Sequence, residues 1–200
     1  MRVRQAAGVL PPVLALAVFV VAGVGIGGGP LQDAFVGVPS TAALQSAIRK
    51  ERLIAARNGA NFVQLTPDEM ASILHARLDP VAQQALDSLR LTLGDDRVTL
   101  DGQLLMETVG RELLGAMAGY VQGRQPIRVT GPVAVRDTGI VSWTPDEVTV
   151  MALRLPQAAI PRLVNYLTGG TEGSFFLRVP RTVGDVKVSR GKVTFYRWGG

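Results

Sequence analysis

The longest uncharged stretch of the chain constrains its fold and location more than any other feature. Residues 5–32 carry no charge, and the most apolar part covers residues 9–26. At about 1.5 Å per residue, 18 to 22 helical residues span about 27–33 Å, which matches the hydrocarbon core of a bilayer. Pro11 and Pro12 fall near the start, where a first helical turn needs no backbone donors. We therefore predict one N-terminal transmembrane helix within residues 1–29.

Two interpretations of this segment stay open, an uncleaved anchor and a cleaved signal peptide. A signal peptide has a shorter apolar core and a small-x-small cleavage site, for which residues 20–22 are only a weak match. Arg2 and Arg4 precede the segment, whereas the next cation after it is Arg49. By the positive-inside rule we expect a single-pass protein of the inner (cytoplasmic) membrane, with a cytoplasmic N-terminus and an extracytoplasmic domain.

The rest of the chain has the polarity of an ordinary globular domain. All 21 Lys and Arg and all 16 Asp and Glu lie outside the uncharged stretch, which gives those residues about the usual globular share of charge. The chain has no Cys and one His, so thiolate sites, disulfides and multi-histidine metal sites are excluded within one chain. No Gly-x-Ser-x-Gly motif occurs. We predict no catalytic residues, no metal, no cofactor and no enzymatic activity.

Two helix signals follow the predicted anchor. Residues 27–39 are rich in Gly and Pro, and Ser40 is expected to cap a helix that runs to about Arg57. The tetrapeptide at residues 66–69, Thr-Pro-Asp-Glu, is a capping box with Pro at the first helical position, and it predicts a helix that ends at Asp79-Pro80. We divide the chain into residues 1–29 (membrane anchor or signal segment), 30–60 (linker and amphipathic helix) and 61–200 (extracytoplasmic α+β domain).

From Leu89 the apolar residues recur at every second position, which is typical of strands. Residues 89–93 and 98–104 predict an antiparallel hairpin with one wet face. A second Thr-Pro-Asp-Glu, at residues 144–147, precedes another period of two, so we predict a hairpin turn there. Residues 151–155 are apolar on both sides apart from Arg154, which predicts a strand covered on both faces or one that changes faces at a bulge.

Two helices and a final hairpin complete the predicted pattern. Residues 107–122 have helical spacing, but three glycines make the helix dependent on packing against the sheet. Pro161 starts a helix that Gly169-Gly170 ends, and residues 175–179 predict a strand. Residues 183–195 predict a hairpin that turns at residues 189–191.

The predicted C-terminal hairpin holds the excess positive charge of the chain. Between Arg178 and Arg197 lie six cations and one acid, so their net charge of +5 equals that of the whole chain. Our candidate membrane-surface residues are Lys187 and Lys192, which alternation places on the outer face, and Arg190, which lies in the turn. The alternative is that these cations serve solubility and protect a sheet edge.

Apolar alternation on every predicted strand gives one large inner face. Such a face either lines a site for a hydrophobic ligand or forms a filled core, and both interpretations stay open. The candidate ligand-lining residues are Leu91, Leu93, Val98, Leu100, Val133, Val135, Trp143, Val148, Val150 and Phe176.

The order of these segments resembles a known group of proteins. The anchor precedes the motifs "LTPDEMASIL", "LRLTLGDDRVTLDGQL", "PIRVTGPVAVRDTGIV", "LRLPQAAIPRLVNYL" and "VPRTVGDVKVSRGKVTFYR". Over about residues 60–197 this arrangement resembles the YpmS-type and LmeA-type bacterial envelope proteins, which are similar to the tubular lipid-binding (TULIP) and AsmA-like superfamilies. The resemblance implies an extracytoplasmic domain with a strongly curved antiparallel sheet wrapped on a long helix, able to hold an acyl chain and without catalytic residues.

We therefore expect an α+β fold with a curved antiparallel sheet packed on helices, TULIP-like, preceded by one transmembrane helix. The expected function is a membrane-anchored extracytoplasmic domain that binds lipid or another hydrophobic ligand in cell-envelope lipid handling, with membrane lipid as its partner. The alternative is a non-catalytic envelope scaffold that has a filled core and binds a partner protein. Export argues against nucleic acid as a partner.

Overall fold

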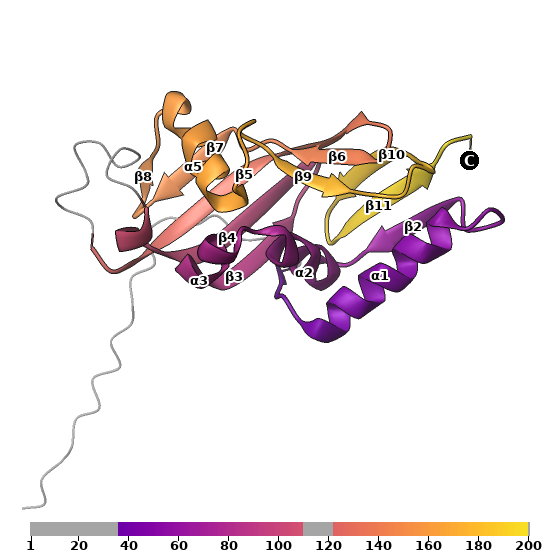
Figure 1. The fold of residues 1–200 in the computed structure, drawn as a ribbon, viewed down its shortest axis with the longest axis horizontal. Coiled ribbons are helices and arrows are strands. Elements are labelled where there is room, and N and C mark those ends of the chain that lie inside the picture. The colour runs from indigo at the N-terminus through magenta and orange to yellow at the C-terminus, as the bar shows by residue number, and fades with distance from the viewer. Residues whose placement is uncertain (1–35, 110–121, 200) are drawn as a thin grey trace, which may run out of the picture. The chain divides into compact units, whose positions relative to one another are not determined.

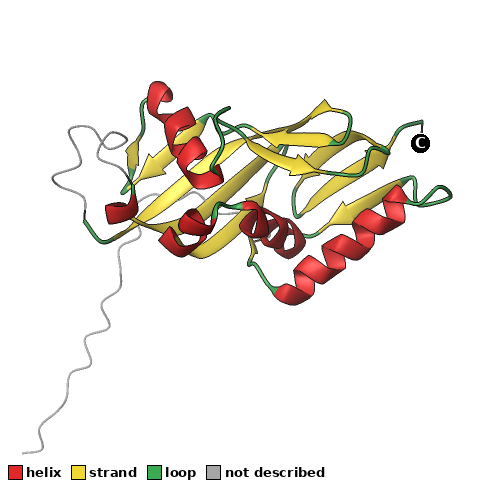
Figure 2. Ribbon diagram, viewed as in Figure 1, coloured by secondary structure: helices red, strands yellow, loops and turns green. Residues whose placement is uncertain are grey.

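The computed structural model describes residues 36–109 and 122–199. The predicted transmembrane segment and most of the predicted helix at residues 107–122 lie outside the described residues. Among the residues that are described, no helix combines the length and the apolar character needed to cross a bilayer. The described residues belong to one compact unit, Gln32–Gly200. Its helices lie beside antiparallel sheets, so the predicted α+β class is confirmed (Figures 1 and 2).

The described strands form two antiparallel sheets. The larger sheet has the order β1-β3-β4-β5-β6-β9, with β7 paired to β5 and β8 paired to β7, and the smaller sheet has the order β10-β11-β2. In chain order the elements are β1 (Val36–Gly37), α1 (Thr41–Ala55), β2 (Phe62–Leu65), α2 (Pro67–Arg77), α3 (Pro80–Ala85), β3 (Leu86–Leu93), β4 (Arg97–Leu105), the 3₁₀ turn η1 (Met106–Thr108), β5 (Arg124–Asp137), β6 (Ile140–Trp143), β7 (Glu147–Val150), β8 (Leu153–Arg154), the 3₁₀ turn η3 (Gln157–Ala159), α5 (Ile160–Thr168), β9 (Phe175–Arg178), β10 (Val183–Ser189) and β11 (Lys192–Arg197).

The helix starts predicted from capping signals are confirmed. The Ser40 hydroxyl accepts a hydrogen bond from the Ala43 N–H at 3.1 Å and begins α1. In the capping box of α2, the Thr66 hydroxyl accepts from the Glu69 N–H, and the Glu69 carboxylate accepts from the Thr66 N–H. Helix α2 ends at Arg77, close to the predicted end at Asp79-Pro80, and the Asp79 carboxylate then caps a further short helix, α3. This helix was not predicted.

The first and the last of the three predicted hairpins are present in the register that alternation requires. Strands β3 and β4 pair Leu91 with Leu100, and all of the apolar residues on that face are buried. Strands β10 and β11 pair Val188 with Val193 and turn at Gly191, whose φ is 73°. The two hairpins meet at their turns, where the Gly191 N–H donates to the Leu93 carbonyl at 3.2 Å.

The predicted hairpin turn at residues 144–147 is wrong. Strand β6 pairs with β5 through Trp143 and Val133, and β7 pairs with the same strand through Glu147 and Thr130. The chain therefore continues in one direction along β5, and residues 144–146 form a bulge between two halves of an interrupted strand. A period of two looks the same on both sides of a bulge, so the pattern did not reveal the direction of the chain.

Gly131 explains why β5 accepts this bulge. A Cβ atom at Gly131 would lie 2.2 Å from the Thr144 carbonyl oxygen and 2.7 Å from the Pro145 Cα. Only glycine lets the bulged backbone approach β5 so closely. The Thr144 N–H then reaches the Pro132 carbonyl at 3.1 Å, so the bulge keeps its backbone hydrogen bonding.

The prediction that residues 151–155 form a strand, either covered on both faces or changing faces at a bulge, is also wrong. Met151 and Ala152 form the turn of a hairpin, and β8 contains only two residues. The side chains of Met151 and Leu153 are 40% and 54% exposed. Apolar composition on both sides of a segment indicates burial only where a second layer covers it, and nothing described covers these side chains.

One hydrophobic core joins both sheets and the helices. It includes Ile54 of α1, Met70 of α2, Leu167 of α5, Leu100 of the larger sheet and Phe195 of the smaller sheet, all at most 4% exposed. The helices lie along the sheets as Figure 1 shows. Because the core is shared, the outer face of the smaller sheet is held in a fixed position relative to the rest of the unit.

Candidate functional site

The structure places most of the predicted ligand-lining residues in the packed core. Val133 and Val135 are only partly buried against this core. A side chain that lines a water-sized space would have accessible surface, so side chains at 0–2% exposure are in contact with other groups on all sides. The residues with such low exposure are Leu91, Leu93, Val98, Leu100, Trp143, Val148 and Val150.

Phe176 lies on the opposite face from the other predicted lining residues. Its ring is partly exposed, and the Arg136 guanidinium carbon lies 5.1 Å from the ring centroid. The inward aromatic residue is its neighbour Phe175, which is 4% exposed and stacks on Trp143 with 4.6 Å between ring centroids. The prediction for Phe176 was wrong because two adjacent phenylalanines leave the phase of the alternation undetermined.

The three candidate membrane-surface cations lie in different environments. Lys187 and Lys192 are exposed on the outer face of the smaller sheet. Neither forms an ion pair within residues 36–109 and 122–199. Arg190 lies in the β10–β11 turn, where its guanidinium is 3.3 Å from the Asp95 carboxylate of the β3–β4 turn. The charge of Arg190 is thus partly neutralised, whereas the two lysines present theirs to solvent.

The outer face of the smaller sheet also carries an aromatic cluster that the sequence analysis missed. Phe62 and Tyr196 pair across β2 and β11, with 6.3 Å between their ring centroids. Trp198 follows two residues after Tyr196. Phe62, Tyr196 and Trp198 are 52%, 38% and 62% exposed. We call the surface formed by Phe62, Tyr196, Trp198 and Lys187 the aromatic–basic patch.

Backbone contacts hold the aromatic–basic patch in place. Gly184 has no side chain, and a Cβ there would lie 2.6 Å from the Trp198 indole, so the ring rests directly on the β10 backbone. The backbone N–H of Trp198 donates to the Thr182 carbonyl at 2.8 Å. The Arg197 guanidinium donates to the carbonyls of Ala56 and Arg57, both at 2.9 Å. These bonds tie the end of β11 to the end of α1.

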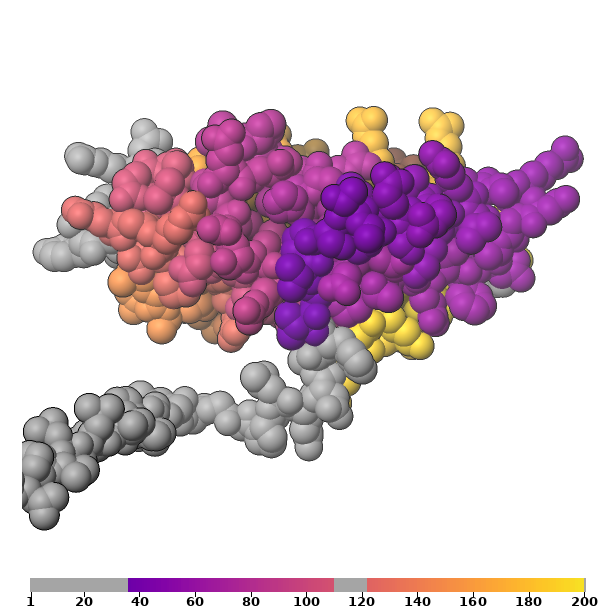
Figure 3. Space-filling view, turned by 90° about the horizontal axis from the view of Figure 1, so that it is seen from below, coloured from indigo at the N-terminus to yellow at the C-terminus, as the bar shows by residue number. Residues whose placement is uncertain are grey.

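A depression lies within the aromatic–basic patch. Its volume is about 450 Å³, and its walls include Tyr196, Trp198, Lys187 and Arg197. Asp185 is the acid that shares this lining. In Figure 3 the C-terminal segment, in yellow, is visible on both sides of the indigo-to-purple N-terminal part. The lining of this depression brings the Tyr196 and Trp198 rings together with Lys187.

An ion pair next to the smaller sheet fixes α1 against β2 and α2. The Lys50 ammonium lies 2.7 Å from the Glu69 carboxylate and 2.7 Å from the Gln64 carbonyl oxygen. Glu69 is 4% exposed. Its burial alone would raise the pKa of the carboxyl, but hydrogen bonds from Lys50 and the Thr66 N–H, with the Lys50 charge, lower that pKa. The ion pair therefore supports the framework of the patch.

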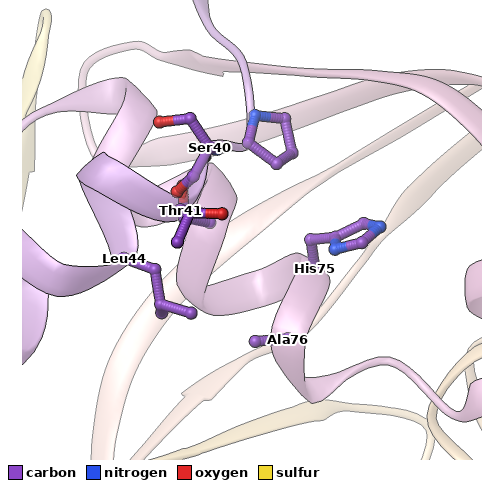
Figure 4. Close-up of a pocket in the computed structure, with 7 residues that line it drawn as sticks. Ser40, Thr41, Leu44, His75 and Ala76 are labelled. Carbon is purple, nitrogen blue, oxygen red and sulfur yellow. Dashed lines mark hydrogen bonds between the residues drawn. The ribbon is translucent and has the colours of Figure 1, made fainter.

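A second groove lies between the start of α1 and the end of α2 (Figure 4). It has a volume of about 240 Å³ and includes Ser40, Ser72 and His75. The Ser72 hydroxyl is buried, accepts from the Ser40 N–H at 2.9 Å and donates to the Asp68 carbonyl at 2.7 Å. These polar groups are used to join the two helices, so we assign this groove a structural role.

Comparisons with known proteins give no relative from which a function can be transferred. No protein-family model matches the chain, and searches of curated proteins and of solved structures found no match. The resemblance to the YpmS-type and LmeA-type proteins stays a prediction. The surface of this chain is therefore the basis for a proposed function.

Proposed function

We propose that this chain is a membrane-anchored extracytoplasmic domain that binds anionic lipid through the aromatic–basic patch, in cell-envelope lipid handling. The exposure of Phe62, Tyr196 and Trp198, by 52%, 38% and 62%, carries the proposal. Tyr and Trp have an apolar body with a polar tip and are enriched where a bilayer meets water. Lys187 beside them attracts anionic headgroups.

The sizes of these contributions favour a reversible contact. A half-exposed aromatic ring that enters the bilayer interface buries on the order of 100 Å², which contributes about 2 kcal/mol at ~25 cal/mol per Å². Each cation near an anionic surface adds about 1 kcal/mol at most, and salt screens it. An anchored domain needs no more than this, because the tether keeps the patch at a high local concentration near the membrane.

The membrane anchor and the TULIP-like fold belong to the same proposal. The uncharged stretch at residues 5–32 supports an anchor with the domain outside the cytoplasm. The order of the motifs supports a TULIP-like arrangement of strands and helices. In this proposal the lipid is bound at the surface of the domain, because the side chains of the inner face already contact one another.

A second candidate function is a non-catalytic envelope scaffold that binds a partner protein. The filled inner face favours it, since residues such as Leu93, Val98 and Trp143 have no accessible surface. Vesicle binding and cross-linking of the full chain distinguish the two. Binding to anionic vesicles without a cross-linked protein partner supports lipid binding, and a stoichiometric cross-linked partner without vesicle binding supports the scaffold.

Flotation of the fragment 32–200 with vesicles tests the patch. We expect binding to vesicles that contain phosphatidylglycerol, little binding to phosphatidylcholine alone, and weaker binding as salt rises. The double variant Phe62→Ser with Trp198→Ser should lose most of the binding. Val38→Ser is the matched control, because Val38 is 53% exposed outside the patch. Equal binding by both variants contradicts the proposal.

A further inference from the structure

The β7–β8 hairpin has an unusual turn. Val150 pairs with Leu153, so Met151 and Ala152 form a two-residue loop, and their φ values are 52° and 65°. Positive φ at both positions is the geometry of a type I′ turn, for which Asn-Gly is strongly favoured. A residue with a Cβ costs about 1–2 kcal/mol in this conformation. The other non-glycine residues with positive φ in the described ranges, Ser88 and Asp96, are polar.

The apolar side chains of this turn face water. Met151 is 40% exposed and Leu153 is 54% exposed, and in Figure 1 β8 lies at the edge of the described unit. The chain thus keeps strained, apolar residues where polar, unstrained ones would fold better. Strain that persists in this way points to a role outside folding. Two side chains alone fall far short of the roughly 1,200–2,000 Å² that a stable protein–protein interface buries, whereas shallow insertion into a bilayer needs only a small apolar tip.

Exposed cations lie directly behind the tip. Arg154 of β8 and Arg128 of β5 both neighbour Thr149 across the strands, and both are 64% exposed. Arg128, Thr149 and Arg154 lie side by side on three neighbouring strands. Thr149 is two residues before Met151 in the chain, so this row is roughly 7 Å from the tip along the strand. The acids Asp101, 2.6 Å from Arg128, and Glu147, 3.9 Å from Arg154, form exposed ion pairs with them. These acids partly neutralise the two cations, but exposed pairs of this kind are weak, so a lipid phosphate can compete with the acids for both guanidinium groups.

We propose that the hairpin tip, Met151–Leu153, inserts into the interface of a lipid bilayer while Arg128 and Arg154 contact lipid phosphates. An apolar wedge that enters by about 5–10 Å places groups 7 Å behind it at the level of the headgroups. In Figure 1 the tip and the C-terminal end of β11 lie at opposite ends of the described unit. The tip is therefore a lipid contact separate from the aromatic–basic patch, and it is tested by a separate probe.

The absence of Cys from the chain makes a single-site label possible. Ala152→Cys in the full chain, labelled with an environment-sensitive fluorophore, is reconstituted into phosphatidylcholine–phosphatidylglycerol vesicles that contain nitroxide lipid. We expect blue-shifted emission and strong quenching at this position. Thr138→Cys, in the exposed β5–β6 turn, is the matched control and should show neither. Equal quenching at both positions, or no quenching at Ala152→Cys, overturns the proposal.

Two further variants separate insertion from a structural role. Met151→Ser with Leu153→Ser, added to the label at position 152, should remove most of the quenching, and unchanged quenching contradicts insertion. Met151→Asn with Ala152→Gly should raise the urea midpoint, and a lower midpoint shows that the turn is not strained. Trp198 fluorescence monitors the aromatic–basic patch in the same samples. Quenching of Trp198 without quenching at position 152 overturns this proposal and leaves the proposed function standing.

Discussion

Removing the buried charge of Glu69 should destabilise the domain by a predictable amount. In Glu69→Gln the amide oxygen still accepts from the Thr66 N–H, but the ion pair with Lys50 is lost. Breaking a fully buried pair costs about 3–5 kcal/mol, whereas losing one charged hydrogen bond costs about 1.5–3 kcal/mol. The Lys50 side chain is 30% exposed, so its ammonium is partly rehydrated in the variant. We therefore expect the free energy of unfolding to fall by about 1.5–3 kcal/mol.

The same carboxyl predicts how stability depends on pH. The pKa of Glu69 is lower in the folded chain than its ordinary value of 4.5. Its contribution to stability is therefore fully present at neutral pH and is lost as the pH falls below about 4.5. Glu51 acts in the opposite sense, because burial raises its pKa, although the nearby Arg77 lowers it in part. Glu51→Gln should accordingly leave stability at neutral pH unchanged or increase it.

Urea denaturation of the fragment 32–200 measures both effects. The buried Trp143, stacked on Phe175, reports unfolding by its fluorescence. Glu69→Gln should lower the midpoint at pH 7 and weaken the acid-induced loss of stability, while Glu51→Gln serves as the matched control. A Glu69→Gln variant as stable as the parent at pH 7, with the same loss in acid, refutes the reasoning.

Three other changes test the fold and the topology. Leu100→Asp should unfold the domain, because an unpaired buried charge costs several kcal/mol against a typical stability of ~5–15; an unchanged melting temperature refutes the inward assignment of this face. Gly131→Ala should destabilise by roughly 1–3 kcal/mol through the clash with Thr144, and an unchanged urea midpoint argues against the close approach of the bulge. A reporter fused after Gly200 should be active only outside the cytoplasm, and activity inside rejects the predicted orientation.

Elements whose signals are local were predictable from the sequence. Ser40 and Thr66 begin helices because a side chain bonds to a backbone N–H only three residues away, and such pairs are visible in the chain. The end of α5 also has a local signal, because Gly169 adopts the left-handed conformation, with a φ of 65°, that commonly ends helices. The hairpin turns at residues 94–97 and 189–191 also lie within a few residues of the strands that they join.

Features that depend on distant partners were not predictable. The bulge at residues 144–146 exists because Gly131, on another strand, leaves room for it. Whether Phe175 or Phe176 faces inward is decided by pairing with Trp143, because both are equally apolar. Met151 is exposed because none of the described helices or strands extends far enough to cover it. The apolar composition of its own segment carries no information about the length of those other elements.

The aromatic–basic patch was half visible in the sequence. Phe195 of β11 is buried, so alternation along the strand places Tyr196 and then Trp198 on the outer face. The contribution of Phe62 was hidden, because it requires β2 to pair with β11 from the other end of the chain. Lys187 was predicted on this face, whereas the ion pair of Arg190 with Asp95 depends on contact between two hairpin turns.

Quenching of Trp198 by lipid tests the central claim most directly. The chain has two tryptophans, and Trp143 is fully buried while Trp198 is 62% exposed. In the full chain reconstituted with phosphatidylglycerol and shallow nitroxide lipid, we predict that part of the tryptophan emission is quenched. The quenched part should shrink at high salt and vanish in Trp198→Phe. Emission that nitroxide lipid leaves unchanged, or quenching that persists in Trp198→Phe, contradicts the account.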